Sequence, residues 1–326
     1  MTAPTFRPEV TILSSSWKKR SSELAYVTRS VAGAASRCAR LKIFVQSECA
    51  DIEPDGAFDV VGIQAEEHRW PELGSERWYR RPHASSVWII DEPSQDAIAL
   101  LDAQQSESAV LTIGSSEGAR GRPLPHLTMT PASSADTIAF GPYVPVNPLA
   151  TASRHTGFGF TDYILVLTDR SGHPSVDDPT PDVAWLTSRF YDEYILVVEG
   201  GRAAAWKGRA LRGVVDVHTR TDLWRLLAHA RVTVDLGPGS IIGRECIESL
   251  RFGTPIVVPA DSVAAEHTRS GGGRTFDDVG GLLEAVELLI DEQGREHTSR
   301  RALEYATFYA DPRFSVGQMT KVLHGI

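Results

Sequence analysis

The sequence has few cysteines and no long apolar run. Its three cysteines, Cys38, Cys49 and Cys246, show neither the CxxC pattern nor the spacing of metal ligands. They predict no disulfide framework and no metal site, and they suit a reducing compartment. No stretch approaches the roughly 18 apolar residues of a membrane-spanning helix, and the first residues show no apolar segment of a secretion signal. We therefore expect a cytoplasmic protein without a bound metal; peripheral contact with a membrane surface stays open.

Positive charge is also scarce. The chain has 33 Lys and Arg against 42 Asp and Glu, which gives a formal net charge of −9, and its one basic run covers residues 18–20. Because a nucleic-acid surface needs clustered positive charge, we expect no nucleic acid among the partners. Walker A, GxGxxG and GxSxG patterns are absent as well, so the sequence predicts no resident cofactor. A nucleotide substrate is compatible with this composition, since it requires only a local group of donors.

The length and the order of the segments predict two domains. A chain of 326 residues exceeds one typical core. In each half, short apolar runs alternate with helical patterns, which is typical of a parallel α/β sheet. Residues 141–159 are rich in proline and glycine and mark the linker. We expect a Rossmann-like domain over 1–150, a second one over 151–312, and a closing helix over 313–326.

The apolar pattern predicts the individual strands and helices. In the first half it indicates a helix from residue 22, another that carries Ala97, Leu100 and Leu101, and strands at 10–13, 41–45, 58–63, 87–90, 109–113 and 127–130. The second half reads as strands at 163–167, 195–198, 214–217, 232–236 and 256–258. Its helices are expected at 182–189, 222–229 (capped by Thr221), 241–252, 280–290, 300–309 and 316–324, with a glycine-rich loop over 266–276.

Residues 230–259 form the most informative stretch. A buried strand is followed by a Gly/Pro/Ser loop, a helix, a Gly-Thr-Pro turn and a second strand. A loop that opens a helix after a strand directs unpaired backbone N–H groups to one point, where the helix dipole adds partial positive charge. This arrangement predicts a phosphate site. Glu248, in the following helix, can accept two hydrogen bonds from a ribose diol, and the alternative is a solvated or ion-paired glutamate, as for Glu245.

Other candidates follow from the rule that ligands bind at the carboxyl ends of parallel strands. Arg170 comes directly after a strand and suits a diphosphate as a bidentate donor, although a surface arginine is an equally good interpretation. His218 can contact a base, or it is one ordinary histidine of ten. In the first half the corresponding loops contain Ser15, Ser16, Asp91, Glu92 and Ser115, which we expect at the acceptor or in a cleft between the domains.

The second half resembles the donor domain of retaining GT-B glycosyltransferases of the large family 4. The resemblance runs from Tyr163 to about Phe314 and rests on HARVTVDLGPGSIIGRECIESLRFGTPIVV, in which ESLRFGTP stands where the family has EAMACGTP after its second glutamate. In the first half, VWIIDEPSQDAIALLDAQQSESAVLTIG resembles a strand–helix–strand segment of the family. The resemblance implies a GT-B fold, two tandem Rossmann-like domains with a cleft, and a final helix that crosses back to the first domain.

The resemblance also implies an activity and its residues. The activity is metal-independent transfer of a sugar from a nucleotide sugar, with retention, to an unknown acceptor that is a carbohydrate, lipid-linked or a protein. Glu248 matches the glutamate that holds the donor ribose, Arg170 lies near a phosphate-binding arginine, and Ser240 occupies the place of the first glutamate, near the sugar. The other donor-site positions are loop residues at strand ends: Gly200, Gly201, Val217, His218, Gly239, Ile241, Ile242 and Gly243.

The chain departs from the family pattern at several of these positions. Ser240 replaces a glutamate, the basic residue expected shortly after Arg170 is absent, and Gly114 or Ser115 stands where the first domain has a histidine. A second interpretation therefore stays open, a non-catalytic protein of the same fold that acts as a partner subunit or a nucleotide-sugar-binding regulator. A GT-B-fold epimerase would need a set of carboxylates and histidines that the sequence does not show.

Overall fold

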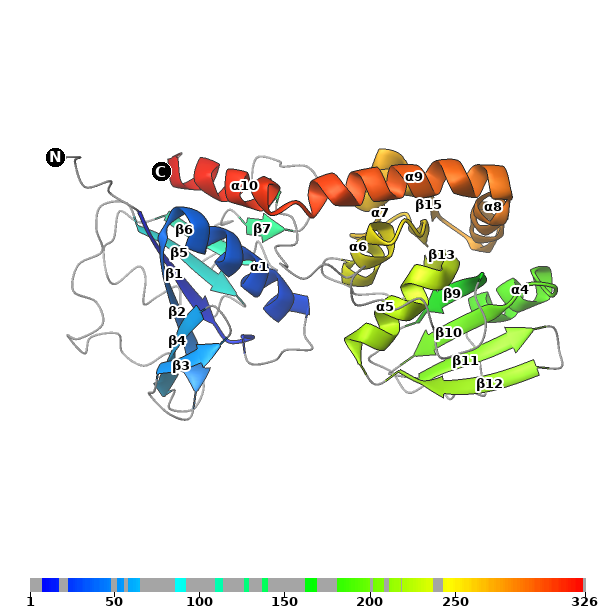
Figure 1. The fold of residues 1–326 in the computed structure, drawn as a ribbon, viewed down its shortest axis with the longest axis horizontal. Helices are drawn as coiled ribbons and strands as arrows, with labels where there is room; N and C mark the ends of the chain where they lie inside the picture. The colour runs from blue at the N-terminus through cyan, green and yellow to red at the C-terminus, as the bar shows by residue number, and fades with distance from the viewer. Residues whose placement is uncertain are drawn as a thin grey trace. The chain divides into compact units, whose positions relative to one another are not determined.

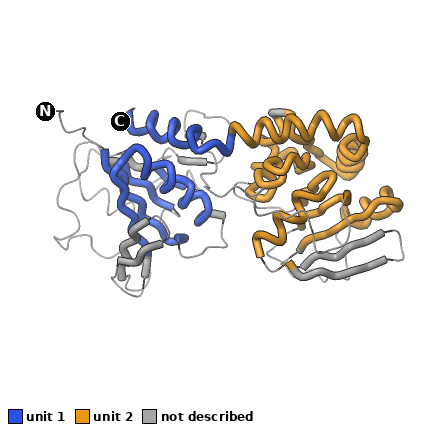
Figure 2. The backbone as a smooth tube through the Cα atoms, viewed as in Figure 1, with its two compact units in different colours: residues 1–145, 309–326 blue, residues 146–308 orange. Residues whose placement is uncertain are grey.

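In the computed structural model of the chain, the described residues are 8–17, 23–47, 52–55, 58–64, 86–91, 109–113, 126–128, 137–139, 162–168, 181–199, 202–207, 211–217, 219–236 and 243–324. The chain divides into two units, as Figure 2 shows. The first unit contains residues 1–145 and 309–326, and the second contains residues 146–308. Each has its own sheet, so each is described by itself.

A mainly parallel sheet forms the first unit. Its described strands follow the order β3-β4-β2-β1-β5-β6-β7-β8, and among them only the pair β3 and β4 is antiparallel. Figure 1 shows helix α1 (Glu23–Cys38) against this sheet. The strands are β1 (Glu9–Ser14), β2 (Arg40–Ser47), β3 (Ile52–Asp55), β4 (Phe58–Gln64), β5 (Ser86–Asp91), β6 (Ala109–Ile113), β7 (His126–Thr128) and β8 (Thr137–Ala139).

The central strands of this unit are apolar because a parallel sheet is covered on both faces. Val10 and Ile12 of β1 and Ile89 of β5 have no exposed surface. Helix α1 presents buried side chains at helical spacing, as the sequence predicts. The chain's last helix, α10 (Pro312–His324), packs against α1 and buries Met319. The end of the chain therefore contributes to the core of the first unit.

The second unit also contains a mainly parallel sheet. Its described strands follow the order β12-β11-β10-β9-β13-β14-β15, and β11 is antiparallel to both of its neighbours. The other pairs are parallel. The strands are β9 (Tyr163–Leu167), β10 (Ile195–Glu199), β11 (Arg202–Lys207), β12 (Leu211–Asp216), β13 (Ala230–Asp235), β14 (Ile256–Pro259) and β15 (Gly273–Phe276).

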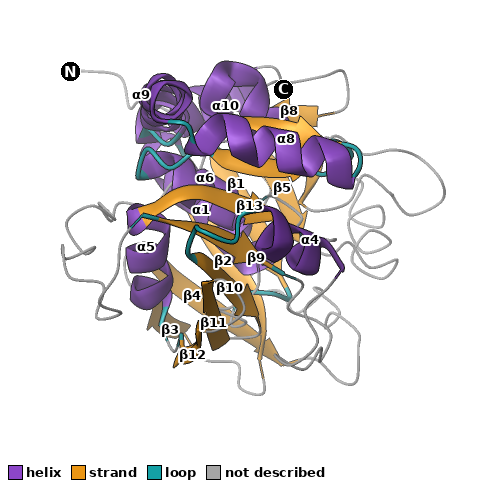
Figure 3. Ribbon diagram, turned by 90° about the vertical axis from the view of Figure 1, so that its right-hand side faces the viewer, coloured by secondary structure: helices purple, strands orange, loops and turns teal. Residues whose placement is uncertain are grey.

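Helices cover both faces of this second sheet. Because side chains alternate along a strand, β9 sends Ile164 and Val166 to one face and Tyr163 and Leu165 to the other. The first face packs under α4 and α8, and the opposite face packs under α5, α6 and α9; Figure 3 shows α4 and α5 on either side of β9 and β13. These helices are α4 (Pro181–Arg189), α5 (Arg220–His229), α6 (Arg244–Arg251), α8 (Val279–Ile290) and α9 (Glu292–Tyr309).

The strand orders place one switch point in each sheet. In the first unit the chain leaves β1 toward β2 on one side, and β5 lies on the other side of β1. In the second unit β10 and β13 flank β9 in the same way. In open α/β sheets the loops that follow the two strands at such a point diverge and leave a crevice at their carboxyl ends. The two places to search for a site are therefore β1/β5 and β9/β13.

Three local predictions need correction. The cap of α5 is Thr219 and not Thr221, because Thr219 and Asp222 form a reciprocal capping box. The hairpin of β11 and β12 was predicted only in part, since the sequence indicates a strand at 214–217 and none over Arg202–Lys207. The glycine-rich loop over 266–276 contains a short helix, α7 (Ala265–His267), a π-helical turn (Thr268–Gly272) and strand β15.

The predicted fold class, α/β with two tandem Rossmann-like domains, is confirmed by the two sheets and their helical layers. Helix α9 is longer than expected and begins at Glu292. Within the described ranges, no helix combines the length and the apolar character needed to cross a membrane.

Candidate functional site

The candidate site lies at the carboxyl ends of β9 and β13 in the second unit. Leu236, just past β13, donates its backbone N–H to the carbonyl of Leu167 at 2.8 Å and so holds the two strand ends together. Thr168, just past β9, is buried and donates its N–H to Val198 at 3.2 Å. The chain re-enters the described part at Gly243 and begins α6 there. The start of α6 therefore stands at the switch point of this sheet.

The entry into α6 requires a glycine. Gly243 is the N-cap residue and has φ 58°, in the left-handed region that strains residues with a Cβ atom. A Cβ atom at this position would also lie 2.8 Å from the Cβ of Ala264, which is buried. The glycine lets the helix start close to the segment that follows β14. The backbone at the start of α6 is thus tightly positioned.

The end of α6 is held by a glycine turn and by buried hydroxyl groups. Gly253 has φ 76° and donates its N–H to the carbonyl of Leu250 at 3.0 Å, a common way to end a helix. Ser249 donates to the hydroxyl of Thr233 in β13 at 2.8 Å, and Thr254 donates to the carbonyl of Leu227 in α5 at 2.7 Å. These bonds anchor the last turn of α6 and the turn that follows it to β13 and α5.

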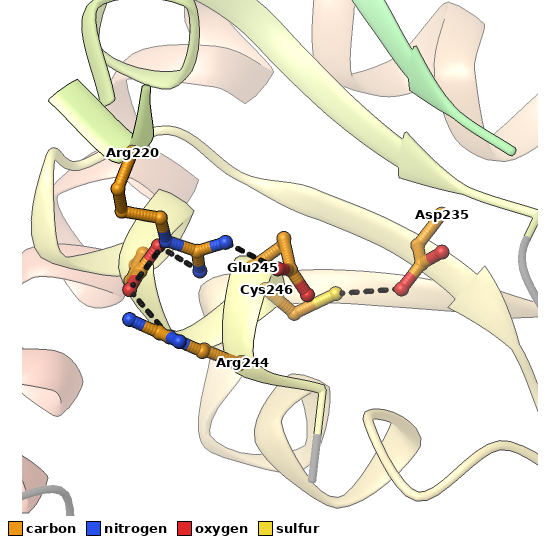
Figure 4. A network of polar contacts seen from close by, with 6 residues as sticks. Arg220, Asp235, Arg244, Glu245 and Cys246 are labelled. Atoms are coloured by element: carbon orange, nitrogen blue, oxygen red, sulfur yellow. Dashed lines mark hydrogen bonds and ion pairs between the residues drawn. The ribbon is translucent and has the colours of Figure 1, made fainter. Parts of the chain in front are cut away.

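Four charged side chains meet beside the start of α6: Arg220, Arg244, Glu245 and Glu248, which we call the Arg220–Glu248 network (Figure 4). Arg220 donates from Nε to Glu248 Oε1 at 3.2 Å and from Nη2 to Glu248 Oε2. Its Nη1 donates to Glu245 Oε1 at 2.6 Å. Arg244, one turn before Glu248 on the same helix, donates from Nε to Glu248 Oε1 at 3.1 Å.

The two carboxylates of the network are more deeply buried than its arginines. Glu245 is 5% exposed and Glu248 4% exposed, whereas the Arg220 side chain keeps 25% of its surface in solvent and Arg244 keeps 15%. Burial by itself lowers the pKa of Arg220, but the charges of Glu248 and Glu245 outweigh it, so that the pKa lies above its usual value. Buried carboxylates need such partners, since an unpaired buried charge is costly. Each buried carboxylate of the network has a guanidinium partner.

A second contact links α6 to the end of β13. The thiol of Cys246, which is fully buried, donates to Asp235 Oδ2 at 3.4 Å. Asp235 is the last residue of β13, and Figure 4 shows this contact beside the network. A carboxylate thus stands at the strand end itself, next to the turn of α6 that carries the arginine–glutamate pairs.

The switch point of the first unit is filled by a different cluster. Asp91, at the end of β5, is 1% exposed and accepts hydrogen bonds from the loop after β1. Ser15 donates its backbone N–H at 2.7 Å and Ser16 its hydroxyl at 2.6 Å, and the hydroxyl of Ser14 bonds to the same carboxylate. Thr28 of α1 donates to Oδ2 at 3.1 Å. Neutral donors alone surround this carboxylate in the described residues.

The serine loop is also fixed from its other end. The Ser14 hydroxyl accepts the N–H of Trp17 at 2.9 Å. Arg29 of α1 donates to the carbonyl of Trp17 at 2.9 Å, and its guanidinium carbon lies 4.5 Å from the centroid of the Trp17 ring. A cation over an indole face is an attractive arrangement. The loop after β1 is therefore locked to β5 and α1.

The structure brings together some of the residues predicted for a site. Ser15, Ser16 and Asp91 are bonded to one another, and Glu248 and Gly243 lie on or at the start of α6. Val217 follows β12 and is half-buried. The other predicted residues lie outside the described ranges: Glu92, Ser115, Arg170, Gly200, Gly201, His218, Gly239, Ser240, Ile241 and Ile242. The ligand roles predicted for all of these residues stay predictions.

Arg220 and Arg244 were not predicted from the sequence. Arg244 and Glu248 are four residues apart on one helix, a spacing that favours an ion pair and could have been used. Arg220 lies 28 residues before Glu248, on another helix, and no local pattern connects the two. In the described part of the chain, no group of three or more His, Cys, Asp or Glu side chains is arranged to hold a metal ion.

Comparison with known proteins shows likeness at the level of structure. No family model and no curated protein sequence matches the chain. A sucrose-phosphate synthase from Thermosynechococcus elongatus is 12% identical, with a TM-score of 0.60 over 98% of this chain and 99% of the other. A UDP-forming α,α-trehalose-phosphate synthase from Burkholderia vietnamiensis is 10% identical, with a TM-score of 0.60 over the same shares.

A third solved structure extends the likeness to another kind of enzyme. The calicheamicin glycosyltransferase CalG4 is 12% identical, with a TM-score of 0.52 over 99% of both chains. All three neighbours are matched along almost their whole length, so the match includes both units. At these identities the likeness shows the fold, and the predicted resemblance to GT-B glycosyltransferases is confirmed at that level.

Proposed function

We propose that this chain, which has the GT-B fold, transfers a sugar from a nucleotide-sugar donor to an acceptor. The observation that carries the proposal is the match over almost the whole chain to solved glycosyltransferases and sugar-phosphate synthases. Since a fold can host several activities, the proposal also has to rest on the chemistry of a site. The second unit supplies a suitable one at the switch point between β9 and β13.

The residues at that edge suit a nucleoside diphosphate. Helix α6 begins there, and the N-terminus of a helix favours an anion. Arg220 and Arg244 are the first residues of α5 and α6, and guanidinium groups pair well with phosphate oxygens. Glu248 supplies carboxylate oxygens beside them, to which a ribose diol can donate. Diphosphate and ribose would thus both meet the second unit.

The finer features of the reaction are also part of the proposal. Retention of configuration follows from the resemblance of residues 230–259 to family 4. Metal independence follows if guanidinium groups and backbone amides neutralise the leaving diphosphate, because fixed donors stabilise developing negative charge. We place the acceptor, a carbohydrate, lipid-linked or protein group, on the first unit, where Asp91 holds the serine loop in one conformation.

A specific observation favours one alternative, which is binding without transfer. Both oxygens of Glu248 are engaged by arginines, and Ser240 stands where the family has a glutamate near the sugar. A chain that binds a nucleotide sugar and lacks transfer would serve as a partner subunit or a regulator. Turnover separates this alternative from the enzyme.

Calorimetry with UDP, ADP, GDP and TDP tests donor binding. We expect one of the four to bind, and Glu248→Gln to weaken it about tenfold, because a diol contact loses a charged acceptor. The matched control is Glu287→Gln, on α8, where Glu287 pairs with Arg189 of α4 at 2.9 Å and 57% of its side chain is exposed. We expect the control to bind like the wild type.

If none of the four nucleoside diphosphates binds, the proposal is overturned. Where binding is found, the corresponding nucleotide sugars are incubated with candidate acceptors, and release of the nucleoside diphosphate is followed. Release that depends on the acceptor supports transfer. If the nucleotide binds but no acceptor raises the release of nucleoside diphosphate above the rate of hydrolysis, the result supports a binding protein instead.

A further inference from the structure

We propose that Arg220 changes partners when the donor binds: its guanidinium leaves Glu248 for the donor's diphosphate, and the ribose diol takes its place on the carboxylate. This inference rests on the proposed function and adds a residue and a movement to it. The contacts of the Arg220–Glu248 network carry it.

The Glu248 carboxylate has a limited capacity for hydrogen bonds. A carboxylate offers about four acceptor positions on its two oxygens. Among the described contacts, Oε1 accepts from Arg220 Nε at 3.2 Å and from Arg244 Nε at 3.1 Å, and Oε2 accepts from Arg220 Nη2. A vicinal diol donates two hydrogen bonds, and both cannot be added to the three already present. At least one arginine contact must therefore open when a ribose binds.

Of the two arginines that contact Glu248, Arg220 is the one that moves. Arg244 is one helical turn from Glu248, so the helix itself keeps the two together. Arg220 reaches Glu248 from another helix, and it is the more exposed arginine, at 25% against 15%. Release of its two bonds to Glu248 opens one acceptor position on each carboxylate oxygen, as many as a diol needs.

The exchange also leaves both buried carboxylates paired with a cation. When Arg220 leaves Glu248, its Nη1 bond to Glu245 at 2.6 Å can persist, and Glu248 keeps Arg244. Neither buried carboxylate is then left without a cation, which would otherwise make the movement costly. The freed Nε and Nη2 groups form the edge of a guanidinium fork that suits phosphate oxygens. The phosphates are attached to the same ribose that carries the diol, so the guanidinium needs only a short movement.

The exchange predicts that Arg220 acts on the diphosphate and not on the nucleoside. We compare the affinity of the wild type and of Arg220→Gln for the nucleoside diphosphate that binds in calorimetry and for the matching nucleoside. We expect Arg220→Gln to weaken the diphosphate about 10- to 100-fold, the range of a hydrogen-bonded charge. The nucleoside should bind equally well or more tightly, because it no longer has to displace an ion pair.

Two further variants make the comparison specific. Arg225→Gln lies on the same helix, where Arg225 pairs with Asp222 at 3.2 Å, and it should leave both affinities unchanged. Arg220→Lys keeps the charge without the fork and should recover part of the diphosphate affinity. If Arg220→Gln fails to fold, the two affinities of Arg220→Lys are compared with those of the wild type instead.

The outcomes distinguish this inference from the proposed function. A wild-type protein that binds none of the nucleoside diphosphates overturns both. If the wild type binds and Arg220→Gln weakens nucleoside and diphosphate by the same factor, Arg220 only positions Glu248, and the exchange is wrong while the function stands. Unchanged affinities in Arg220→Gln overturn the exchange in the same way.

Discussion

Asp91 and Glu248 are both buried carboxylates near a switch point, yet their surroundings differ. Asp91 is held by serine and threonine hydroxyls and a backbone N–H, which are neutral donors. Glu248 is held by two guanidinium groups. A carboxylate satisfied by short neutral side chains fixes a loop, whereas one paired with long cationic side chains can exchange partners. This difference at the level of single residues separates a structural anchor from a candidate binding group.

Tyr163 provides a prediction on alkaline stability. It is fully buried, and its hydroxyl donates to the carbonyl of Leu226 at 2.7 Å. Burial raises the pKa of Tyr163 above its usual value. The folded state therefore holds this proton more tightly than the unfolded state, and the stability gained is present below about pH 10 and lost as the pH rises above it.

Tyr163→Phe should thus have two effects in urea denaturation. Near neutral pH we expect a loss of about 1 kcal/mol, for the missing hydrogen bond. Above about pH 10, the decline of stability with pH should be shallower than in the wild type. Tyr191→Phe, at a side chain that is 63% exposed, is the control. A Tyr163→Phe protein with the wild-type alkaline decline would contradict the prediction.

At the scale of the element, α6 depends on its glycine entry. Gly243→Ala combines a left-handed backbone with a Cβ contact of 2.8 Å to Ala264. Strain of about 1–2 kcal/mol from the conformation and about 1–3 kcal/mol from overpacking predicts a total loss of about 2–5 kcal/mol. Denaturant unfolding measures it.

A second glycine supplies the matched control for this substitution. Gly317 lies in α10, and a Cβ atom there would meet nothing within 4 Å. Gly317→Ala should therefore gain about 0.5–1 kcal/mol, because alanine favours the helix. Equal effects of the two changes would show that the entry of α6 is not constrained.

We also expect Gly243→Ala to weaken nucleoside diphosphate binding, since it displaces the first turn that carries Arg244.

At the scale of the whole molecule, the two units have separate cores. Met319 is buried in the first unit, on α10, and Leu282 is buried in the second, on α8. Truncating either side chain to alanine should cost about 2–4 kcal/mol in its own unit, through lost burial and a cavity. Units with separate cores need not unfold in a single transition.

Hydrogen exchange measured by mass spectrometry locates the effect of each change. Met319→Ala should raise exchange in α1 and β1, although residue 319 is far from them in the sequence. Leu282→Ala should raise exchange in β9 and β13 and leave α1 as in the wild type. Faster exchange in both units for either variant would show that the two cores unfold together.

Much of the architecture was predictable because it depends on local patterns. The continuous apolar run of β9 predicts a strand covered on both faces, and the helical spacing of Val27 and Val31 predicts α1. The Gly-Thr-Pro turn after α6 was predictable because glycine, here Gly253, tolerates the left-handed conformation. The edge hairpin β11–β12 was harder to predict, because the apolar run of Arg202–Lys207 is mostly alanine, a residue that is depleted in strands.

The alternation of strands and helices, the glycine turn after α6 and the resemblance of residues 230–259 to a donor domain could be predicted from the sequence alone. These features depend on neighbouring residues, so a single stretch is enough to indicate them. The partners of the buried carboxylates, in contrast, could be identified only from the tertiary structure. Arg220 and Glu248 are 28 residues apart, and Ser15 and Asp91 are 76 residues apart. Strand order brings these side chains together, and a linear pattern contains no record of which distant donor meets which acceptor.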